Sequence, residues 1–279
     1  MAITALRPMS CLGIMALALG CSLGLAGAAE AAPDAKLLAA AEKAQPALIE
    51  TLKEMVLIES GSRQVDGLLK MAALVEGRLK ALGAETERRK ATAGAGADIV
   101  LGVFKGAGKR KIMLQAHMDT VYGPGILDSQ PYKIDGNRLY GPGIADDKGG
   151  LAVILASLQI LKDAGWRDYD TLTVLANPDE EVGSMGSGEL IASLADRHDV
   201  VLSFEPTAAK SIVKGEPLLL GAAGIATATM DVKGRAGHAG AAPELGRNAL
   251  IELAYQLLRT KDLAKEIPGV TLNWTELHT

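Results

Sequence analysis

Cysteine is almost missing from this sequence of 279 residues. The two that occur, Cys11 and Cys21, both lie near the N-terminus. The rest of the chain contains no thiol, which excludes a disulfide framework and a thiolate-ligated metal site there. Any transition metal must therefore be bound by histidine and carboxylate side chains.

Aromatic residues and excess positive charge are also scarce. Aromatic residues make up 3% of the chain, so alanine, leucine, isoleucine and valine must fill the core that a hydrophobic content of 48% allows. The formal net charge of −4 argues against nucleic acid as a partner. The length suggests one large domain, or one domain and part of another.

A long apolar run, from residue 11 to residue 26, lies close to the N-terminus. Arg7 precedes it and the alanine-rich segment 26–32 follows it, which is the layout of a secretory signal peptide. We therefore predict a signal peptide over residues 1–32 and a secreted or periplasmic mature protein. Two alternatives stay open: a retained membrane anchor, for which the run is near the short limit, and a lipoprotein site at Cys21.

Short apolar runs alternate with helical segments through the middle of the chain. The expected strands are 112–116, 171–176 and 200–204. The helices expected between them are 149–162 and 187–195. This alternation predicts an α/β domain with a doubly wound, mostly parallel sheet, over residues 33–219.

The character of the sequence changes near residue 220. Residues 225–233 alternate like a half-exposed strand, 248–265 reads as an amphipathic helix, and 270–276 is expected to be another strand. A glycine- and alanine-rich loop before this helix carries His238. We expect residues 220–279 to form a second, α+β domain that is incomplete.

Histidine and carboxylate residues follow each of the three expected strands. His117 and Asp119 follow the first, Glu180 and Glu181 the second, and Glu205 the third. Because ligands bind beyond the carboxyl ends of parallel strands in doubly wound sheets, we expect these residues to form an active site.

Asp146 is the natural centre of such a site, since the two oxygens of one carboxylate can bind two cations. A donor set of nitrogen and oxygen suits Zn²⁺ and is compatible with Co²⁺ or Mn²⁺. Taken singly, these residues carry little weight. His117 has another interpretation as a strand-end histidine, Asp-Glu-Glu at 179–181 as a solvated loop, and Glu205 before Pro206 is weak evidence alone.

Five segments carry motifs that are specific in combination. They are Ala-His-Met-Asp-Thr-Val-Tyr (116–122), Gly-Pro-Gly-Ile-Ala-Asp-Asp-Lys-Gly-Gly (141–150), Asp-Glu-Glu (179–181), Leu-Ser-Phe-Glu-Pro-Thr (202–207) and Gly-His-Ala-Gly-Ala-Ala-Pro-Glu-Leu-Gly (237–246). Together they resemble the M20 metallopeptidase family. Within it they are similar to the glutamate carboxypeptidases of the carboxypeptidase G type, which remove C-terminal glutamate from folates. The resemblance extends from about residue 36 to the last residue.

The resemblance implies a zinc-exopeptidase domain with two Zn²⁺ per subunit and an inserted dimerisation, or lid, domain. It assigns His117 and Glu205 to one zinc, Glu181 to the other, and Asp146 to both as a bridge. It also implies that the peptide bond between Asp146 and Asp147 is cis.

Further roles come from the same resemblance. Glu180 matches the general base, and Asp119 matches the residue that orients His117. His238 matches a histidine that reaches the active site of a neighbouring subunit, so a homodimer is expected. The alternative interpretation of His238 is an ordinary polar residue in a loop. The second zinc needs a further histidine that His278 does not match, which leads us to expect a fragment or a truncated chain that alone is inactive.

The function expected is a zinc-dependent exopeptidase that hydrolyses the amide bond to a C-terminal amino acid, with glutamate favoured. The substrate is then a small molecule or peptide with a C-terminal carboxylate. An N-acyl amino-acid deacylase on the same metal site is the first alternative. A non-catalytic truncated protein is the second.

Overall fold

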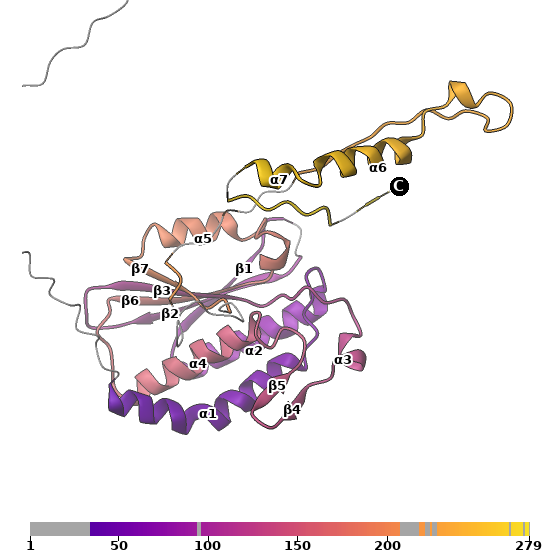
Figure 1. Cartoon of the computed structure of the whole chain (residues 1–279). Helices are drawn as coiled ribbons and strands as arrows, with labels where there is room; N and C mark the ends of the chain where they lie inside the picture. Colours follow the sequence, from indigo (N-terminus) through magenta and orange to yellow (C-terminus); the bar gives the residue numbers. More distant parts are fainter. Residues whose placement is uncertain are drawn as a thin grey trace, which may run out of the picture. The chain divides into compact units, whose positions relative to one another are not determined.

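The computed structural model describes residues 34–93, 96–206, 218–220, 224, 228–267, 269–275 and 277–278. The predicted signal peptide lies outside them. The chain divides into two compact units, Met1–Gly215 and Glu216–Thr279, and each is described by itself (Figure 1). Within the described ranges, no helix is long and apolar enough to cross a membrane.

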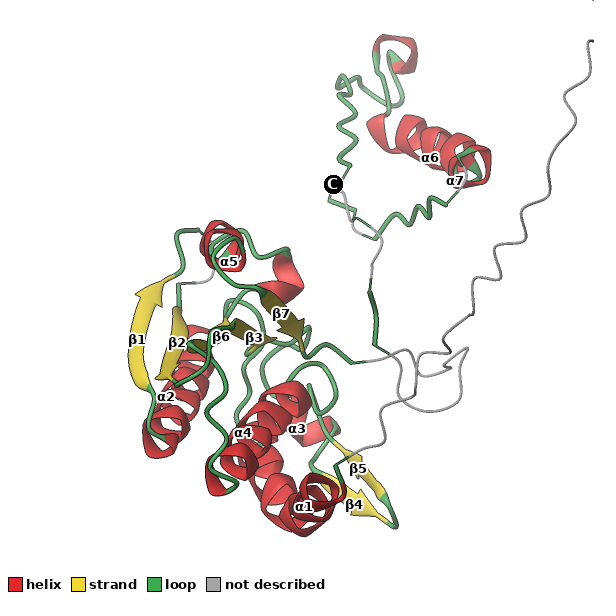
Figure 2. Cartoon of the chain, turned by 90° about the vertical axis from the view of Figure 1, so that its left-hand side faces the viewer, coloured by secondary structure: helices red, strands yellow, loops and turns green. Residues whose placement is uncertain are grey.

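A five-stranded sheet forms the centre of the first unit (Figures 1 and 2). Its strands, in the order of the sheet, are β1 (Glu85–Lys90), β2 (Asp98–Lys105), β6 (Thr171–Asn177), β3 (Lys111–His117) and β7 (Val200–Ser203). Strands β6, β3 and β7 are parallel to one another, whereas β1 pairs antiparallel with β2, and β2 pairs antiparallel with β6. The predicted α/β class is confirmed, but the sheet is mixed and not mostly parallel as expected, because only the pairs β3–β6 and β3–β7 are parallel. These parallel strands are the ones that end near the expected site.

Helices cover both faces of this sheet, as Figure 2 shows. Helices α1 (Ala35–Val56), α2 (Val65–Leu82) and α4 (Lys148–Asp163) pack on one face, and α5 (Gly188–Ala195) lies on the other. Strand β2 contributes to both cores, because successive side chains point to opposite faces. Val100 packs under the three helices, whereas Ile99 and Leu101 pack with residues of α5. Burial on both faces explains the continuous apolar runs of the central strands.

The connections between the parallel strands place the site. The chain leaves β3, passes through α4 on one face and enters β6; it then passes through α5 on the other face and enters β7, on the far side of β3. The carboxyl end of β3 is therefore a switch point, where ligands bind in doubly wound sheets. The long loop after β3 contains α3 (Ile126–Ser129) and a hairpin of β4 (Lys133–Asp135) and β5 (Arg138–Tyr140).

The second unit contains the 3-10 helix η2 (Pro243–Leu245) and the helices α6 (Ala249–Thr260) and α7 (Leu263–Glu266). The helix expected at 248–265 is thus present as two shorter helices. The two expected strands are wrong where they can be checked: residues 228–233 and 270–275 are not in strands. A strand needs a hydrogen-bonded neighbour, and an isolated pair of strands is marginal in water.

Two glycines of α2 allow a matched test of packing. A Cβ atom at Gly67 would lie 1.7 Å from the carbonyl oxygen of Glu59, whereas one at Gly77 would meet nothing within 4 Å. We expect Gly67→Ala to destabilise the fold by about 1–3 kcal/mol through overpacking. Gly77→Ala should stabilise it by about 0.5–1 kcal/mol through helix propensity. Denaturant unfolding of both variants measures the difference, and equal effects would contradict the close approach of α2 to Glu59.

Candidate metal centre

The ends of the parallel strands bring the predicted residues together. His117 is the last residue of β3 and pairs in register with Asn177, the last residue of β6. Glu180 begins the 3-10 helix η1 (Glu180–Val182) shortly after β6, and Glu205 follows β7 by two residues. The expectation that these side chains gather at one edge of the sheet is therefore met in the geometry.

Asp119 is fully buried. Its carboxylate accepts hydrogen bonds from several segments of the site and so connects them. Its Oδ1 accepts the backbone N–H of Glu180 at 3.0 Å, and its Oδ2 accepts that of Glu181 at 3.1 Å. The hydroxyl of Ser62 donates to Oδ2 at 2.8 Å. Burial alone would raise the pKa of Asp119, but hydrogen bonds from His117 and Ser62 outweigh it and lower the pKa. The carboxylate thus fixes the turn that carries both glutamates.

The ring of His117 is held from both sides. Its Nδ1 lies 3.0 Å from the carbonyl oxygen of Asp119 and 3.3 Å from Oδ1 of the same residue, and its Nε2 lies 2.9 Å from Oδ1 of Asp146. Burial lowers the pKa of this histidine. Hydrogen bonds to Asp119 and Glu205, and the charge of Asp147, act in the opposite direction and raise the pKa to about 11. Without a metal, the ring is therefore a cation surrounded by carboxylates.

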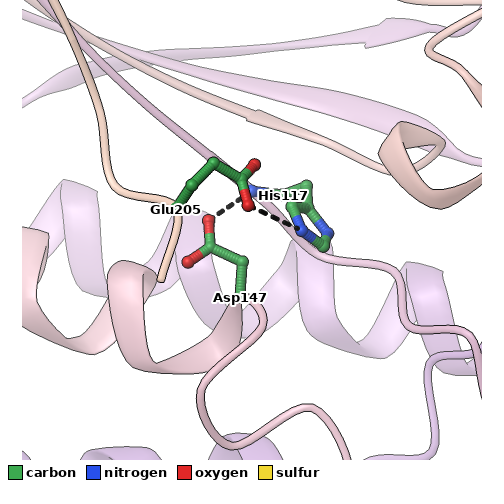
Figure 3. A group of neighbouring side chains, drawn as sticks. All are labelled: His117, Asp147 and Glu205. Atoms are coloured by element: carbon green, nitrogen blue, oxygen red, sulfur yellow. Dashed lines mark hydrogen bonds and ion pairs between the residues drawn. The ribbon is translucent and has the colours of Figure 1, made fainter. Parts of the chain in front are cut away.

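Asp147 is a site residue that the sequence reasoning missed. Its Oδ2 accepts the backbone N–H of His117 at 3.1 Å, and its carboxyl group faces Glu205 (Figure 3). Its other oxygen, Oδ1, is buried and has no hydrogen-bond partner within the described part of the chain. Burial, together with the charges of Glu205 and Asp146, raises the pKa of Asp147 to about 8. The adjacent Asp-Asp pair and the implied cis bond are the signals in the sequence from which it could have been found.

The segment before α4 is shaped so that two aspartates point into the site. The peptide bond between Asp146 and Asp147 is cis, as the family resemblance implies. Gly150 leaves room for this arrangement, since a Cβ atom there would lie 2.1 Å from Oδ1 of Asp147 and 2.5 Å from the carbonyl oxygen of Phe204. The fully buried Lys148 donates from Nζ to the carbonyl oxygen of Ile58 at 2.8 Å, which anchors the start of α4 to the end of α1.

The two adjacent glutamates differ in their neighbours. Glu181 has its pKa raised to about 7 by burial and by the charge of Asp146. Glu180, whose side chain is 41% exposed, lies 3.9 Å from Nε2 of His117. Burial and the charge of Glu205 raise its pKa, although the positive charge of His117 opposes the shift. Both carboxyl groups are therefore more basic than free glutamate.

A second buried carboxylate organises the chain after the glutamates. Asp179 accepts the backbone N–H groups of Gly186 at 2.6 Å and Ser187 at 3.1 Å, and the hydroxyl of Ser187 at 2.5 Å. The side-chain amide of Asn177 donates to the same hydroxyl at 3.2 Å. Because every bond of this network is buried, the loop from η1 to α5 is fixed in place.

Two other histidines, His198 and His238, have hydrogen-bond partners within their own units. His198 uses both ring nitrogens within the fold, with Nδ1 2.7 Å from the carbonyl oxygen of Leu194 and Nε2 2.9 Å from the hydroxyl of Thr173. His238 lies in the second unit, where its Nδ1 accepts the backbone N–H groups of Gly240 and Ala241 at 3.2 and 3.0 Å. The Nε2 of a neutral His238 ring therefore carries the proton and can donate it.

Two overlapping groups of donors could hold a cation. They are His117, Asp147 and Glu205, and His117, Asp146 and Glu181; within each group the donor atoms lie within 4.8 Å of one another. Several carboxylates crowd around one histidine, and one buried oxygen of Asp147 lacks a partner. A cation would neutralise the repulsion and satisfy that oxygen, so the residues present fit a metal with nitrogen and oxygen ligands.

Comparison with known proteins gives the class of this chain. The model of the peptidase family M20/M25/M40 matches residues 113–274, and the chain belongs to that family. It is 47% identical over 242 residues to carboxypeptidase G2 of Pseudomonas sp. (strain RS-16), covering 87% of this chain and 57% of that protein. It is 32% identical over 188 residues to acetylornithine deacetylase of Aliivibrio fischeri (strain MJ11), and the match covers 62% of this chain and 47% of that protein. The chain thus spans about half the length of these relatives.

Solved structures support the same fold. A tripeptidase from Staphylococcus aureus superposes with a TM-score of 0.53 at 22% sequence identity, covering 76% of this chain and 55% of the other. Human carnosine dipeptidase 1 superposes with a TM-score of 0.52 at 21% sequence identity, covering 60% of this chain and 40% of the other. At this level of identity the similarity concerns the fold alone.

The raised pKa values predict that metal binding competes with protons. At pH 7 without metal, His117 is protonated and Glu181 is about half protonated. Both groups must lose the proton to act as ligands, so affinity should fall as the pH falls. Between pH 8 and pH 6 we expect the zinc affinity to fall about tenfold per pH unit for each proton that zinc binding releases. Calorimetric titration with zinc in two buffers of different ionisation enthalpy counts the protons; a pH-independent affinity would contradict the prediction.

Proposed function

We propose that this chain is part of a zinc-dependent exopeptidase that hydrolyses the amide bond to a C-terminal amino acid, with glutamate as the preferred residue. The observation that carries the proposal is the convergence of His117, Asp146, Glu181 and Glu205 at one edge of the sheet, in a chain 47% identical to a carboxypeptidase. We assign His117 and Glu205 to one zinc, Glu181 to a second, and Asp146 to both. Co²⁺ or Mn²⁺ would suit the same donors.

When bound, zinc supplies a Lewis acid that polarises the scissile carbonyl and makes the attacking water more acidic. Glu180 then acts as the general base, taking a proton from that water and passing it to the nitrogen of the leaving amine. Its raised pKa favours this proton transfer. Asp119 supports the reaction by holding the backbone of Glu180 and the ring of His117 in place.

A second candidate is an N-acyl amino-acid deacylase. It is favoured by the 32% identity to an acetylornithine deacetylase, since both reactions hydrolyse an amide next to an amino acid carboxylate. The two candidates share the metal centre and differ in whether the acyl group or the released amino acid is recognised. Comparing hydrolysis of an acyl-glutamate with that of acetylornithine separates them.

We also propose an exported protein that works as a homodimer. Export is supported by the order of Arg7, apolar run and alanine-rich segment in residues 1–32. The dimer is supported by the match of His238 to the family motif. Because Nδ1 of His238 accepts backbone N–H groups, its Nε2 offers an N–H that suits a hydrogen bond to a substrate carbonyl. Residues 220–279 would belong to the dimerisation domain.

The two adjacent glutamates should respond differently to the same substitution. Glu180→Gln should keep the metal but lose about 10²–10⁴ in kcat, because an amide cannot accept the proton of the attacking water. Glu181→Gln should instead lower the zinc content. These variants are best made in the full-length enzyme, with metal analysis beside the kinetics. Normal turnover by Glu180→Gln would show that the two roles are assigned wrongly.

For the chain of 279 residues alone, we expect fewer than two zinc ions per chain and no release of glutamate from a folate-like substrate. The reason is that, among the described residues of the first unit, His117 is the histidine grouped with Glu181, and His198 is engaged with Leu194 and Thr173. Metal analysis of the purified chain and a glutamate-release assay in excess zinc check this. Turnover in that assay would overturn the expectation.

A further inference from the structure

A hollow of about 440 Å³ lies beside the metal centre in the first unit. Its wall includes Glu181 at one side, the turn of Ser62, Arg63 and Gln64, and the loop that continues to Pro124. This volume is in the range of small-molecule sites. Glu181 therefore borders both the metal centre and this hollow.

Both walls of the hollow are fixed by hydrogen bonds. The backbone N–H of Ser62 donates to the carbonyl oxygen of Thr120 at 2.9 Å, and the side-chain amide of Gln64 donates to that of Tyr122 at 3.1 Å. Gly61 brings the two segments close, since a Cβ atom there would lie 2.0 Å from the carbonyl oxygen of Tyr122. The hollow is therefore preformed.

The opposite end of the loop is held as well. The carboxylate of Glu59 accepts the backbone N–H groups of Gly125 and Leu127 at 2.8 and 3.0 Å. Residues 59–64 thus bind the loop 120–127 at several points. The hydroxyl of Ser62 also donates to Asp119, which fixes this turn relative to Glu180 and Glu181.

Arg63 stands out in this turn. Its φ angle is 72°, in the left-handed region that residues other than glycine rarely adopt. Its side chain is exposed, lines the hollow, and forms no hydrogen bond or ion pair with any residue that the structure describes. The backbone of Arg63 is thus fixed beside a site rich in carboxylates, and its side chain can place its guanidinium in the hollow.

We propose that Arg63 is a specificity-determining residue that binds a carboxylate of the substrate in this hollow. The inference rests on the proposed function, because it requires a substrate bound at the metal centre. A guanidinium recognises a carboxylate through two parallel hydrogen bonds. Glutamate offers two candidates, the α-carboxylate and the side-chain carboxylate, and the chemistry of Arg63 is the same for both.

The test measures binding of three ligands to the zinc-supplemented chain by equilibrium dialysis. The ligands are N-benzoyl-glutamate, N-benzoyl-glutamine, which lacks the side-chain carboxylate, and N-benzoyl-isoglutamine, which lacks the α-carboxylate. We expect Arg63→Gln to weaken binding of N-benzoyl-glutamate about 10- to 100-fold, as for a lost charge-assisted hydrogen bond. For one amide ligand the substitution should have no effect, and that ligand identifies the carboxylate that Arg63 binds.

Three further variants separate charge from structure. Arg63→Gly suits the left-handed backbone, so it should weaken binding as Arg63→Gln does without lowering stability. Arg63→Lys keeps the charge but not the paired geometry and should weaken binding less. Arg110→Gln is the matched control, because Arg110 precedes β3 at the edge opposite His117, and it should bind like the unaltered chain.

The outcomes separate this proposal from the proposed function. If the unaltered chain binds N-benzoyl-glutamate and Arg63→Gln binds it equally well, the role of Arg63 is wrong and the proposed function stands. An equal loss for all three ligands would also overturn the role, since no particular carboxylate would be involved. If the unaltered chain binds none of the ligands, the carboxylate subsite is wrong, whereas the proposed function is decided separately by glutamate release from the full-length enzyme.

Discussion

The site depends on the buried carboxylate of Asp119 and the donors that surround it. A buried charge is costly unless hydrogen bonds satisfy it. Here the backbone N–H groups of Glu180 and Glu181 and the hydroxyl of Ser62 donate to it, and the ring of His117 lies against it. One carboxylate therefore joins the end of β3, the turn after β6 and the turn after α1. The positions of the proposed base and of one proposed ligand follow from these bonds.

The same arrangement brings several carboxylates close together, and their mutual repulsion is unfavourable for folding. The raised pKa values of Asp147 and Glu181 record this, since burial and mutual repulsion make both groups hold protons more tightly than usual. His117 relieves part of the repulsion by carrying a proton itself. A bound cation would take over that task, and such clusters of perturbed groups are typical of functional sites.

The relatives of this chain include a carboxypeptidase and a deacetylase. The shared sheet edge can then supply the chemistry common to amide hydrolysis, while the loops beside it select the substrate. In this chain those loops include the turn at 61–64 and the segment 120–125, which are bonded to each other and to Asp119. The turn and the segment that line the hollow are thus joined by hydrogen bonds to the carboxylate that holds Glu180 and Glu181.

The sequence by itself determined the α/β class and the edge of the sheet where His117, Glu180 and Glu205 gather, because short apolar runs define strands and their last residues define one edge. Tertiary structure decided the rest. The inward placement of Asp147 depends on how closely Gly150 lets the backbone approach, and the left-handed Arg63 depends on contacts with a segment almost sixty residues away. The strands expected in the second unit failed for the same reason: an alternating pattern forms a strand only where a neighbouring strand accepts its hydrogen bonds.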